Sequence, residues 1–146
     1  MPFPVPRLLL AALLLLCSGL FPALAEDVEA SDMVRGGLQA IQMIDRDQAG
    51  ELWDGATPAT RKRITRTDFA SKVAKSRAPL GGPQQRTWVA VHRQVVTDPD
   101  ADAAGQYVSV EYETRFGNTP ERTLRERVSF RLDADRIWRF SGYVVR

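Results

Sequence analysis

The sequence contains one cysteine and one histidine, and each scarcity excludes a class of chemistry. The single cysteine, Cys17, has no second thiol with which to form a disulfide inside the chain. With His92 as the only histidine, a metal site built on several imidazole ligands is impossible. A serine–histidine system would depend on His92, yet no Gly-x-Ser-x-Gly segment is present. We therefore expect no metal and no cofactor, with His92 on the surface or on one face of a sheet.

Long apolar runs are also scarce, and the one clear example lies near the N-terminus. Residues 8–16 are all apolar, Arg7 precedes them, and the tripeptide Ala-Leu-Ala follows at residues 23–25. This order of positive charge, apolar run and small residues is typical of a secretory signal peptide. We predict a signal peptide at residues 1–25 and a single domain at residues 26–146, located in the periplasm or secreted. The alternative is that this segment stays uncleaved as a membrane anchor. If it is cleaved, the mature protein has no stable membrane anchor.

Neither sign of charge dominates the sequence. Twenty basic and eighteen acidic residues give a formal net charge of +2, and the two signs are interspersed. Such mixing is typical of a solvated surface and does not favour a polyanionic partner. We therefore expect no nucleic-acid binding.

The first half of the predicted domain shows helical periodicity. Apolar residues recur three or four positions apart between Met33 and Ile44, which predicts an amphipathic helix from about residue 28 to residue 46. Two adjacent glycines, Gly36 and Gly37, lie inside this helix and lower its intrinsic stability. Close packing of the helix against a sheet would explain them, and a kink is the alternative.

Three shorter helices are expected before residue 80. Asp47 is placed to cap a short helix that contains Trp53. Thr57, followed by proline, marks the start of another. Thr65, with an acid three residues later, resembles a capping box and begins a fourth helix. The glycines and prolines of residues 79–83 end all helical structure.

The second half alternates apolar and polar residues, which predicts strands with one buried face. The predicted strands lie at about residues 85–96, 106–116, 124–132 and 138–144. Short turns join them, so the expected sheet is a four-stranded antiparallel meander. The helices should cover one face of it, giving an α+β fold.

The second and third strands allow a register to be predicted, because a slip of one residue would place charges in the core. Centring the turn between them on Thr119 pairs Tyr112 with Glu126 on the inner face. On the outer face, Glu113 then lies opposite Arg125, and Glu111 lies opposite Arg127.

The facing of the outermost strands is predicted from the same alternation. In the first strand we place Val89, Val91 and Val95 inward, with Trp88, Ala90 and His92 on the other face. In the last strand we place Trp138, Phe140 and Val144 inward.

Several short segments occur in an order that resembles a family of secreted bacterial proteins, domain of unknown function 4019. The segments are Ile44-Asp45-x-Asp47, Trp53, Phe69, Arg77-Ala78-Pro79-Leu80-Gly81, Arg86, Tyr107-Val108-Ser109-Val110, Glu126 and Trp138-Arg139-x-x-Gly142-Tyr143. The resemblance spans about residues 39–145, and Phe69 stands where that family often has tryptophan. It implies an exported α+β protein and no assigned activity. The order of elements also resembles the cone-shaped nuclear-transport-factor-2-like and cystatin-like folds.

Glu126 is the most unusual polar residue, because the strand pattern places it among apolar residues beside Tyr112. A carboxyl in an apolar pocket has a raised pKa, which suits acid–base chemistry. The alternative is a structural carboxylate bonded to Tyr112, an arginine or a helix end. We take Trp53, Tyr112 and Glu126 as candidate ligand-binding residues.

A second acidic feature is the series Asp98-x-Asp100-x-Asp102, which resembles part of a calcium loop. Ala103 and Ser109 occupy the positions where that loop needs glycine and glutamate. We therefore predict an acidic hairpin loop.

Three functions are compatible with these features. The first is a module without catalysis that binds a small molecule or a protein. The second is a hydrolase, isomerase or lyase that uses Glu126 and Tyr112 in a cone pocket. The third is a self-associating structural domain, a possible homodimer, that uses an outer face with Tyr107, Ser141 and Tyr143.

Overall fold

The computed structural model describes residues 29–146, so the predicted signal peptide lies outside the described residues. Helices form the first half of the described chain and strands the second, as the α+β prediction requires. The elements are α1 (Ala30–Asp45), α2 (Ala49–Asp54), α3 (Pro58–Arg63), α4 (Arg66–Arg77), a short 3-10 helix η1 (Ala78–Leu80), β1 (Pro83–Val96), β2 (Gly105–Phe116), β3 (Leu124–Leu132) and β4 (Trp138–Val145). Within residues 29–146, no helix is both long and apolar enough to span a membrane.

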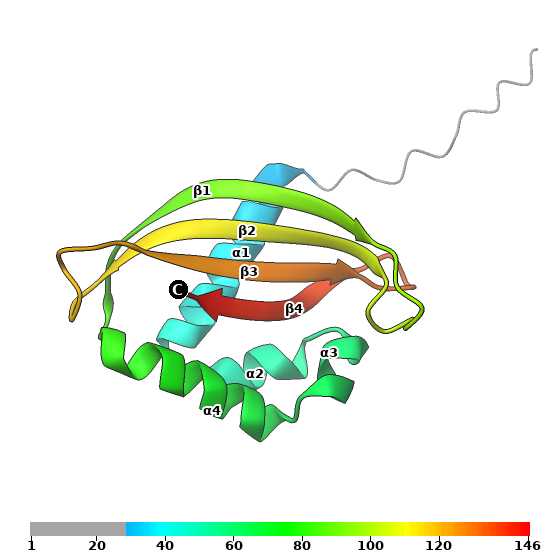
Figure 1. Ribbon diagram of the computed structural model, residues 1–146, viewed down its shortest axis with the longest axis horizontal. Helices are drawn as coiled ribbons and strands as arrows, with labels where there is room; N and C mark the ends of the chain where they lie inside the picture. The colour runs from blue at the N-terminus through cyan, green and yellow to red at the C-terminus, as the bar shows by residue number, and fades with distance from the viewer. Residues whose placement is uncertain (1–28) are drawn as a thin grey trace, which may run out of the picture.

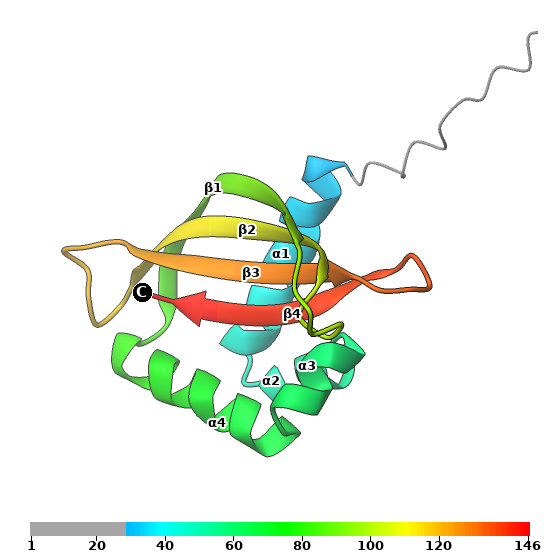
Figure 2. The same ribbon diagram turned by 45° about the vertical axis from the view of Figure 1, so that its right-hand side comes forward.

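The four strands form one antiparallel sheet in the order β1-β2-β3-β4 (Figure 1). Each strand pairs with its neighbour in sequence, which confirms the predicted meander. The sheet curves, and α1 crosses its inner face behind β1, β2 and β3 (Figures 1 and 2). The shorter helices lie below β4, where α3 and α4 both contact that strand.

The core lies between α1 and the inner face of the sheet. Its members include Ile41, Ile44, Val108, Val110, Val128 and Phe140, each nearly inaccessible to solvent. Gly37 allows α1 to approach this closely, because a Cβ added there would lie 2.7 Å from the Tyr112 hydroxyl and 3.3 Å from Val110 Cβ. Close packing of helix on sheet, rather than a kink, therefore explains this glycine.

The predicted register of β2 and β3 is confirmed. Tyr112 pairs with Glu126, and the pairs Glu113–Arg125 and Glu111–Arg127 lie on the other face. The arginines bind these carboxylates: Arg125 Nη1 lies 2.9 Å from Glu111 Oε2, and Arg125 Nη2 lies 2.9 Å from Glu113 Oε1. The outer basic residues are thus neutralised by acids on the adjacent strand.

The facing of β1 is only partly as predicted. Its pairing with β2 shifts by one residue after Trp88, so Val89 is the extra residue of a β-bulge. The bulge changes which alternate residues point inward. Val91 packs against the core as predicted, but Trp88 lies opposite Tyr112 on the inner face, contrary to the prediction. Trp88 is half exposed there because it lies on an edge strand.

A second bulge corrects the predicted facing of β4. Ser129 pairs with Gly142 while Phe130 pairs with Phe140, so Ser141 is an extra residue. Phe140 is buried as predicted, but beyond the bulge Tyr143 turns inward and Val144 turns outward, with 51% of its surface exposed. The prediction of Val144 as a core residue is therefore wrong. The prediction of Tyr143 on the outer face is wrong for the same reason.

The short helices follow their predicted start signals with one correction. The Thr65 hydroxyl accepts the Asp68 backbone N–H at 3.1 Å, which confirms that cap. Asp47 does not cap α2, because it adopts φ +58° at the end of α1 and Gln48 precedes α2 instead. Aspartate tolerates this left-handed conformation, and the Gln48 N–H donates to the Met43 carbonyl to close the helix end.

Candidate functional site

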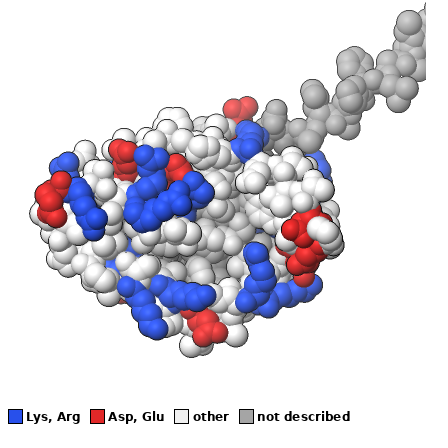
Figure 3. Space-filling model, in the orientation of Figure 1, with Lys and Arg blue, Asp and Glu red and all other residues white. Residues whose placement is uncertain are grey.

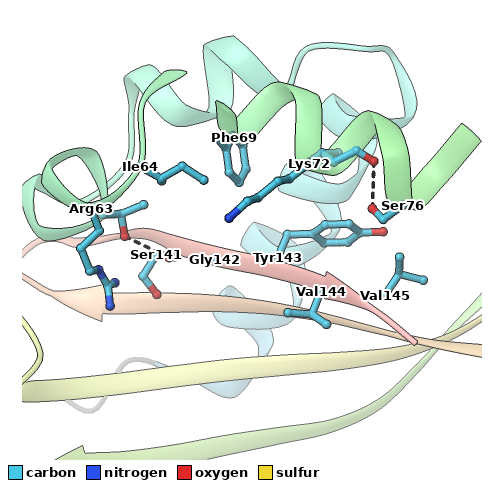
Figure 4. Close-up of a pocket in the computed structure, with 12 residues that line it drawn as sticks. Arg63, Ile64, Phe69, Lys72, Ser76, Ser141, Gly142, Tyr143, Val144 and Val145 are labelled. Atoms are coloured by element: carbon cyan, nitrogen blue, oxygen red, sulfur yellow. Dashed lines mark hydrogen bonds between the residues drawn. The ribbon is translucent and has the colours of Figure 1, made fainter. Parts of the chain in front are cut away.

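A groove of about 340 Å³ runs between α4 and the outer edge of β4 (Figure 4). One wall comes from α4 and from the residues before it, and the other wall is the last part of β4. The lining residues are Thr60, Arg63, Ile64, Phe69, Lys72, Val73, Ser76 and residues 141–145. Most of the lining is apolar, while Arg63 and Lys72 bring positive charge. We call this feature the α4–β4 groove.

Local hydrogen bonds hold α3 against the start of this edge. The Thr57 backbone N–H donates to the Phe140 carbonyl at 2.8 Å. The Thr60 hydroxyl donates to the Ser141 carbonyl at 2.9 Å. Both threonines are buried, so these bonds are shielded from water. Two carbonyls in the middle of β4, those of Phe140 and Ser141, are therefore occupied by α3 and its N-cap residue.

The last residues of β4 direct some of their backbone groups away from β3 and towards the groove. Arg125 and Arg146 exchange two backbone hydrogen bonds, of 2.8 and 3.0 Å. Because an antiparallel ladder alternates, Tyr143 and Val145 direct their N–H and C=O groups away from β3. That direction leads towards α4, and both residues line the groove. The groove therefore contains main-chain donors and acceptors besides its apolar walls.

Arg63 and Lys72 lie on the groove without carboxylate partners in the part of the chain that the structure describes. Neighbouring cations are paired: Lys62 lies 3.3 Å from Asp102, and Arg66 lies 2.9 Å from Asp54. In the space-filling view, lysine and arginine gather along the lower margin, where α3 and α4 lie in Figure 1 (Figure 3). The groove is therefore an apolar channel with two cations available to an anionic ligand.

Tyr143 connects the groove to a buried carboxylate behind it. Its hydroxyl donates to Glu126 Oε1 at 2.7 Å. Glu126 is fully buried, and it also accepts from Arg86 Nε at 2.7 Å and from the Thr114 hydroxyl. The carboxylate thus fixes the orientation of the tyrosine ring on the groove.

Two arginines extend this cluster to the helices. Arg86 Nη1 lies 2.8 Å from Asp45 Oδ2 on α1, and Arg77 Nη2 on α4 lies 2.6 Å from Asp45 Oδ1. Arg77 Nη1 also lies 3.5 Å from Glu126 Oε1. We call Asp45, Arg77, Arg86 and Glu126 the buried ion-pair network. Its two acids and two bases balance, and it joins α1, α4, β1 and β3.

The electrostatics favour the charged form of Asp45 and the protonated form of Tyr143. Burial alone would raise the pKa of Asp45, but hydrogen bonds from Arg86 and Arg77 lower it below its ordinary value of 3.8. Burial, followed by the negative charge of Glu126, raises the pKa of Tyr143 well above its ordinary value. The phenol therefore stays protonated and donates. The network acts as a frame that holds the groove wall in place.

The structure brings two of the three predicted binding residues together. Tyr112 and Glu126 are opposite each other in the sheet, but the Tyr112 hydroxyl donates to the Val34 carbonyl on α1. Burial raises the pKa of Tyr112 to about 12. Trp53 lies apart from them and donates its indole N–H to the Ile64 carbonyl at 2.9 Å. Trp53 thereby supports a residue of the groove without lining it.

The predicted acidic hairpin is present between β1 and β2, and its carboxylates stabilise the turn. Asp98 accepts the Asp100 N–H at 2.8 Å, and Asp100 accepts the Asp102 N–H at 2.9 Å. His92 lies on the outer face, 3.5 Å from Glu111. Among residues 29–146, no cluster of histidine, cysteine, aspartate or glutamate has the arrangement of a metal site.

The groove residues Arg63, Lys72 and Tyr143 were not identified as a site by sequence reasoning. Arg63 and Lys72 resemble solvated surface cations when read along the chain. The adjacent Ser141 and Gly142 are a signal that could have revealed the bulge and hence the inward turn of Tyr143, because small residues inside a strand often mark such irregularities.

A comparison with known protein families gives a match. The model of a family described as "Protein of unknown function (DUF4019)" matches residues 37–143, which include every element from the middle of α1 to β4. No curated protein matches the chain.

Proposed function

Because this chain belongs to the DUF4019 family, whose description names no activity, we propose its function from its geometry: a binding module without catalysis, whose ligand occupies the α4–β4 groove. The observation that carries the proposal is the coincidence of apolar walls, free backbone groups and two unpaired cations at one place. Binding sites commonly combine an apolar lining with a few polar groups that orient the ligand. A ligand with an apolar part and a negative charge matches this lining.

The surroundings of Glu126 support binding over catalysis. Arg86, Thr114 and Tyr143 occupy the oxygens of this carboxylate, which is inaccessible to solvent. A general acid or base must reach its substrate, directly or through one water molecule. The hydrolase, isomerase or lyase alternative therefore gains no support from this geometry. In our proposal Glu126 and Tyr112 shape the fold, and Trp53 positions the groove.

Two broader proposals accompany the binding role. We propose that the protein is exported, supported by Arg7, the apolar run and the small residues at 23–25. We also propose that its helix-covered curved sheet belongs to the nuclear-transport-factor-2-like or cystatin-like cones. The order of helices before a four-stranded meander supports that class.

The binding role can be tested by native mass spectrometry of the protein purified from the exported fraction of cells that produce it. We expect a retained ligand on the wild-type protein, and its loss in Lys72→Glu, which reverses a groove charge. Lys75→Glu is the matched control, because Lys75 is an exposed lysine on the same helix outside the groove. A ligand retained equally by Lys72→Glu, or bound at residues away from the groove, would contradict the proposal.

A further inference from the structure

We propose that the occupant of the α4–β4 groove is an extended peptide segment that adds as a fifth strand beside β4 and carries an acidic side chain to Arg63 and Lys72. This inference rests on the proposed function and specifies its ligand class. It follows from three features of the groove: the alternation of β4, the position of α4, and the unpaired charge.

The backbone of β4 supplies the first argument. Tyr143 and Val145 are two positions apart, and each offers one N–H and one C=O towards the groove. Another strand presents donors and acceptors at the same repeat, since successive outward residues lie about 7 Å apart along a strand. Recognition by strand addition uses these main-chain bonds for affinity and side-chain pockets for specificity.

The arrangement of α3 shows where such a strand would begin. Thr57 and Thr60 donate to the carbonyls of Phe140 and Ser141, so the edge is occupied at these two residues. Proteins usually protect edge strands against unwanted pairing. Here the protection stops at the groove, and the opening is confined between α3 and the end of β4. A short segment, rather than a whole added sheet, fits this length.

The position of α4 supplies the second argument. Phe69 and Val73 are buried residues of α4 that line the groove. Figure 4 shows Phe69 pointing from α4 towards β4. Side chains of an added strand alternate between the two faces of the sheet. Those on the inner face would meet Phe69 and Val73, which are apolar. The occupant should therefore carry apolar residues at every second position.

The charge of the groove supplies the third argument. Lys72 projects from α4 towards β4, and Arg63 lies at the other end of the groove (Figure 4). Neither has an acidic partner among residues 29–146. An acidic residue of the peptide would form a charge-assisted hydrogen bond with one of them. This complementarity favours an acidic over a basic peptide.

The test starts with a random seven-residue peptide library selected on the wild-type protein alone. We expect enriched sequences that alternate apolar residues and contain glutamate or aspartate. Affinities of synthetic fluorescent versions are then measured by anisotropy. Lys72→Glu should weaken binding about tenfold or more, equivalent to about 1.4 kcal/mol, while Lys75→Glu should change it less than about twofold.

N-methylation of alternate amides of the selected peptide tests the strand geometry. Only one of the two alternating sets of N–H groups can face β4. Methylation of that set should weaken binding at least about tenfold, and methylation of the other set should have little effect. Equal affinities of the two methylated peptides would overturn strand addition.

The failures of the inference and of the proposed function have different signatures. If peptides bind but Lys72→Glu has no effect, they bind elsewhere and both proposals fail. If no peptide is enriched, decanoate serves as a small apolar anion in the same Lys72→Glu and Lys75→Glu comparison. If decanoate binds, and Lys72→Glu weakens this binding while Lys75→Glu does not, the groove remains a ligand site. The proposal that its occupant is a peptide would then be overturned. If decanoate also fails to bind, the peptide proposal and the proposed function are both overturned. A groove that is filled by a second copy of the chain would overturn both as well.

Discussion

At the scale of single residues, the fully buried Glu126 decides between a structural and a functional reading of the inner face. Its oxygens bind Arg86, Thr114 and Tyr143. Replacement by leucine removes the carboxylate that accepts from Tyr143 and Thr114, and it leaves the buried Arg86 with only one of its two acidic partners, Asp45. Loss of one member of a buried ion pair costs about 3–5 kcal/mol. We predict a decrease of this size in the free energy of unfolding of Glu126→Leu, measured by urea denaturation.

Glu113→Gln provides the comparison for that change. Glu113 forms an ion pair with Arg125 on the outer face, where its side chain is nearly half exposed. Exposed ion pairs contribute about 0–1 kcal/mol, so this variant should remain close to wild type. Greater stability of Glu126→Leu than of the wild-type protein would show that the carboxylate is kept for a function instead of for the fold.

Glu111 makes stability depend on pH in the acid range. Hydrogen bonds from Arg127 and then Arg125 lower its pKa from 4.5 to about 2, against the opposing effect of burial. Because the folded state favours the charged form, this contribution is complete above pH 4.5 and is lost as the pH falls from 4.5 towards 2. We predict that thermal stability drops less between pH 6 and pH 3 in Glu111→Gln than in the wild type. Identical drops would contradict the assignment.

At the scale of elements, the two adjacent glycines of α1 should respond oppositely to alanine. A Cβ at Gly36 would meet Phe130 Cζ at an ordinary 3.7 Å. Gly36→Ala should therefore stabilise the protein by about 0.5–1 kcal/mol through helix propensity. At Gly37 the new Cβ would collide with the bonded Tyr112 hydroxyl and press on Val110. Gly37→Ala should cost about 1–3 kcal/mol by overpacking.

Chemical denaturation of both variants compares these effects in one helix. Stabilisation by both alanines would mean that α1 lies farther from the sheet than in this structure. Destabilisation by both would mean that Gly36 also makes a close approach.

The free edge of β4 can be tested with proline. The N–H of Val145 points away from β3, so Val145→Pro should retain the ladder and cost no more than about 1 kcal/mol. Val144 donates to β3, and Val144→Pro should cost more because it removes a ladder hydrogen bond. Thermal unfolding of the two variants gives the comparison. Equal losses would show that the alternation of β4 is assigned incorrectly.

The elements themselves could be predicted from sequence, but the facing of the edge strands could not. Alternation in β2 and β3 continues without interruption, so aligning their apolar faces and centring the turn on Thr119 sufficed to predict the register. β1 has two extra residues, Gln84 and Val89, and β4 has one, Ser141, and each of them exchanges the two faces beyond it. A one-residue bulge leaves local composition almost unchanged, so alternation continued through it predicts the wrong face.

The groove could not be predicted because it depends on contacts between distant segments. Thr60 binds the carbonyl of Ser141, and Trp53 binds the carbonyl of Ile64, and neither contact has a local sequence signature. Lys72 and Arg63 become distinctive only when the apolar groove beside them is seen in three dimensions. For Glu126, by contrast, its isolated charge on an apolar strand face correctly indicated a buried carboxylate.

At the scale of the whole molecule, the fold holds the last part of the β4 edge open beside α4. The buried ion-pair network joins α1, α4, β1 and β3, and through Tyr143 it reaches β4. Next to the groove, α3 and its N-cap residue occupy the carbonyls of Phe140 and Ser141 on the β4 edge. The molecule thus holds α4 at a fixed separation from the free backbone groups of Tyr143 and Val145. A preorganised groove of this kind lowers the entropic cost of binding a flexible segment.

Amide hydrogen exchange of β4, followed by NMR with and without the selected acidic peptide, tests this account most directly. In the free protein we predict fast exchange at Tyr143 and Val145 and slow exchange at Gly142 and Val144, because only the latter pair donate to β3. Saturation with peptide should slow Tyr143 and Val145 at least about tenfold and leave Gly142 and Val144 unchanged. Protection of Tyr143 and Val145 before peptide is added, or fast exchange that persists at saturation, would contradict the account.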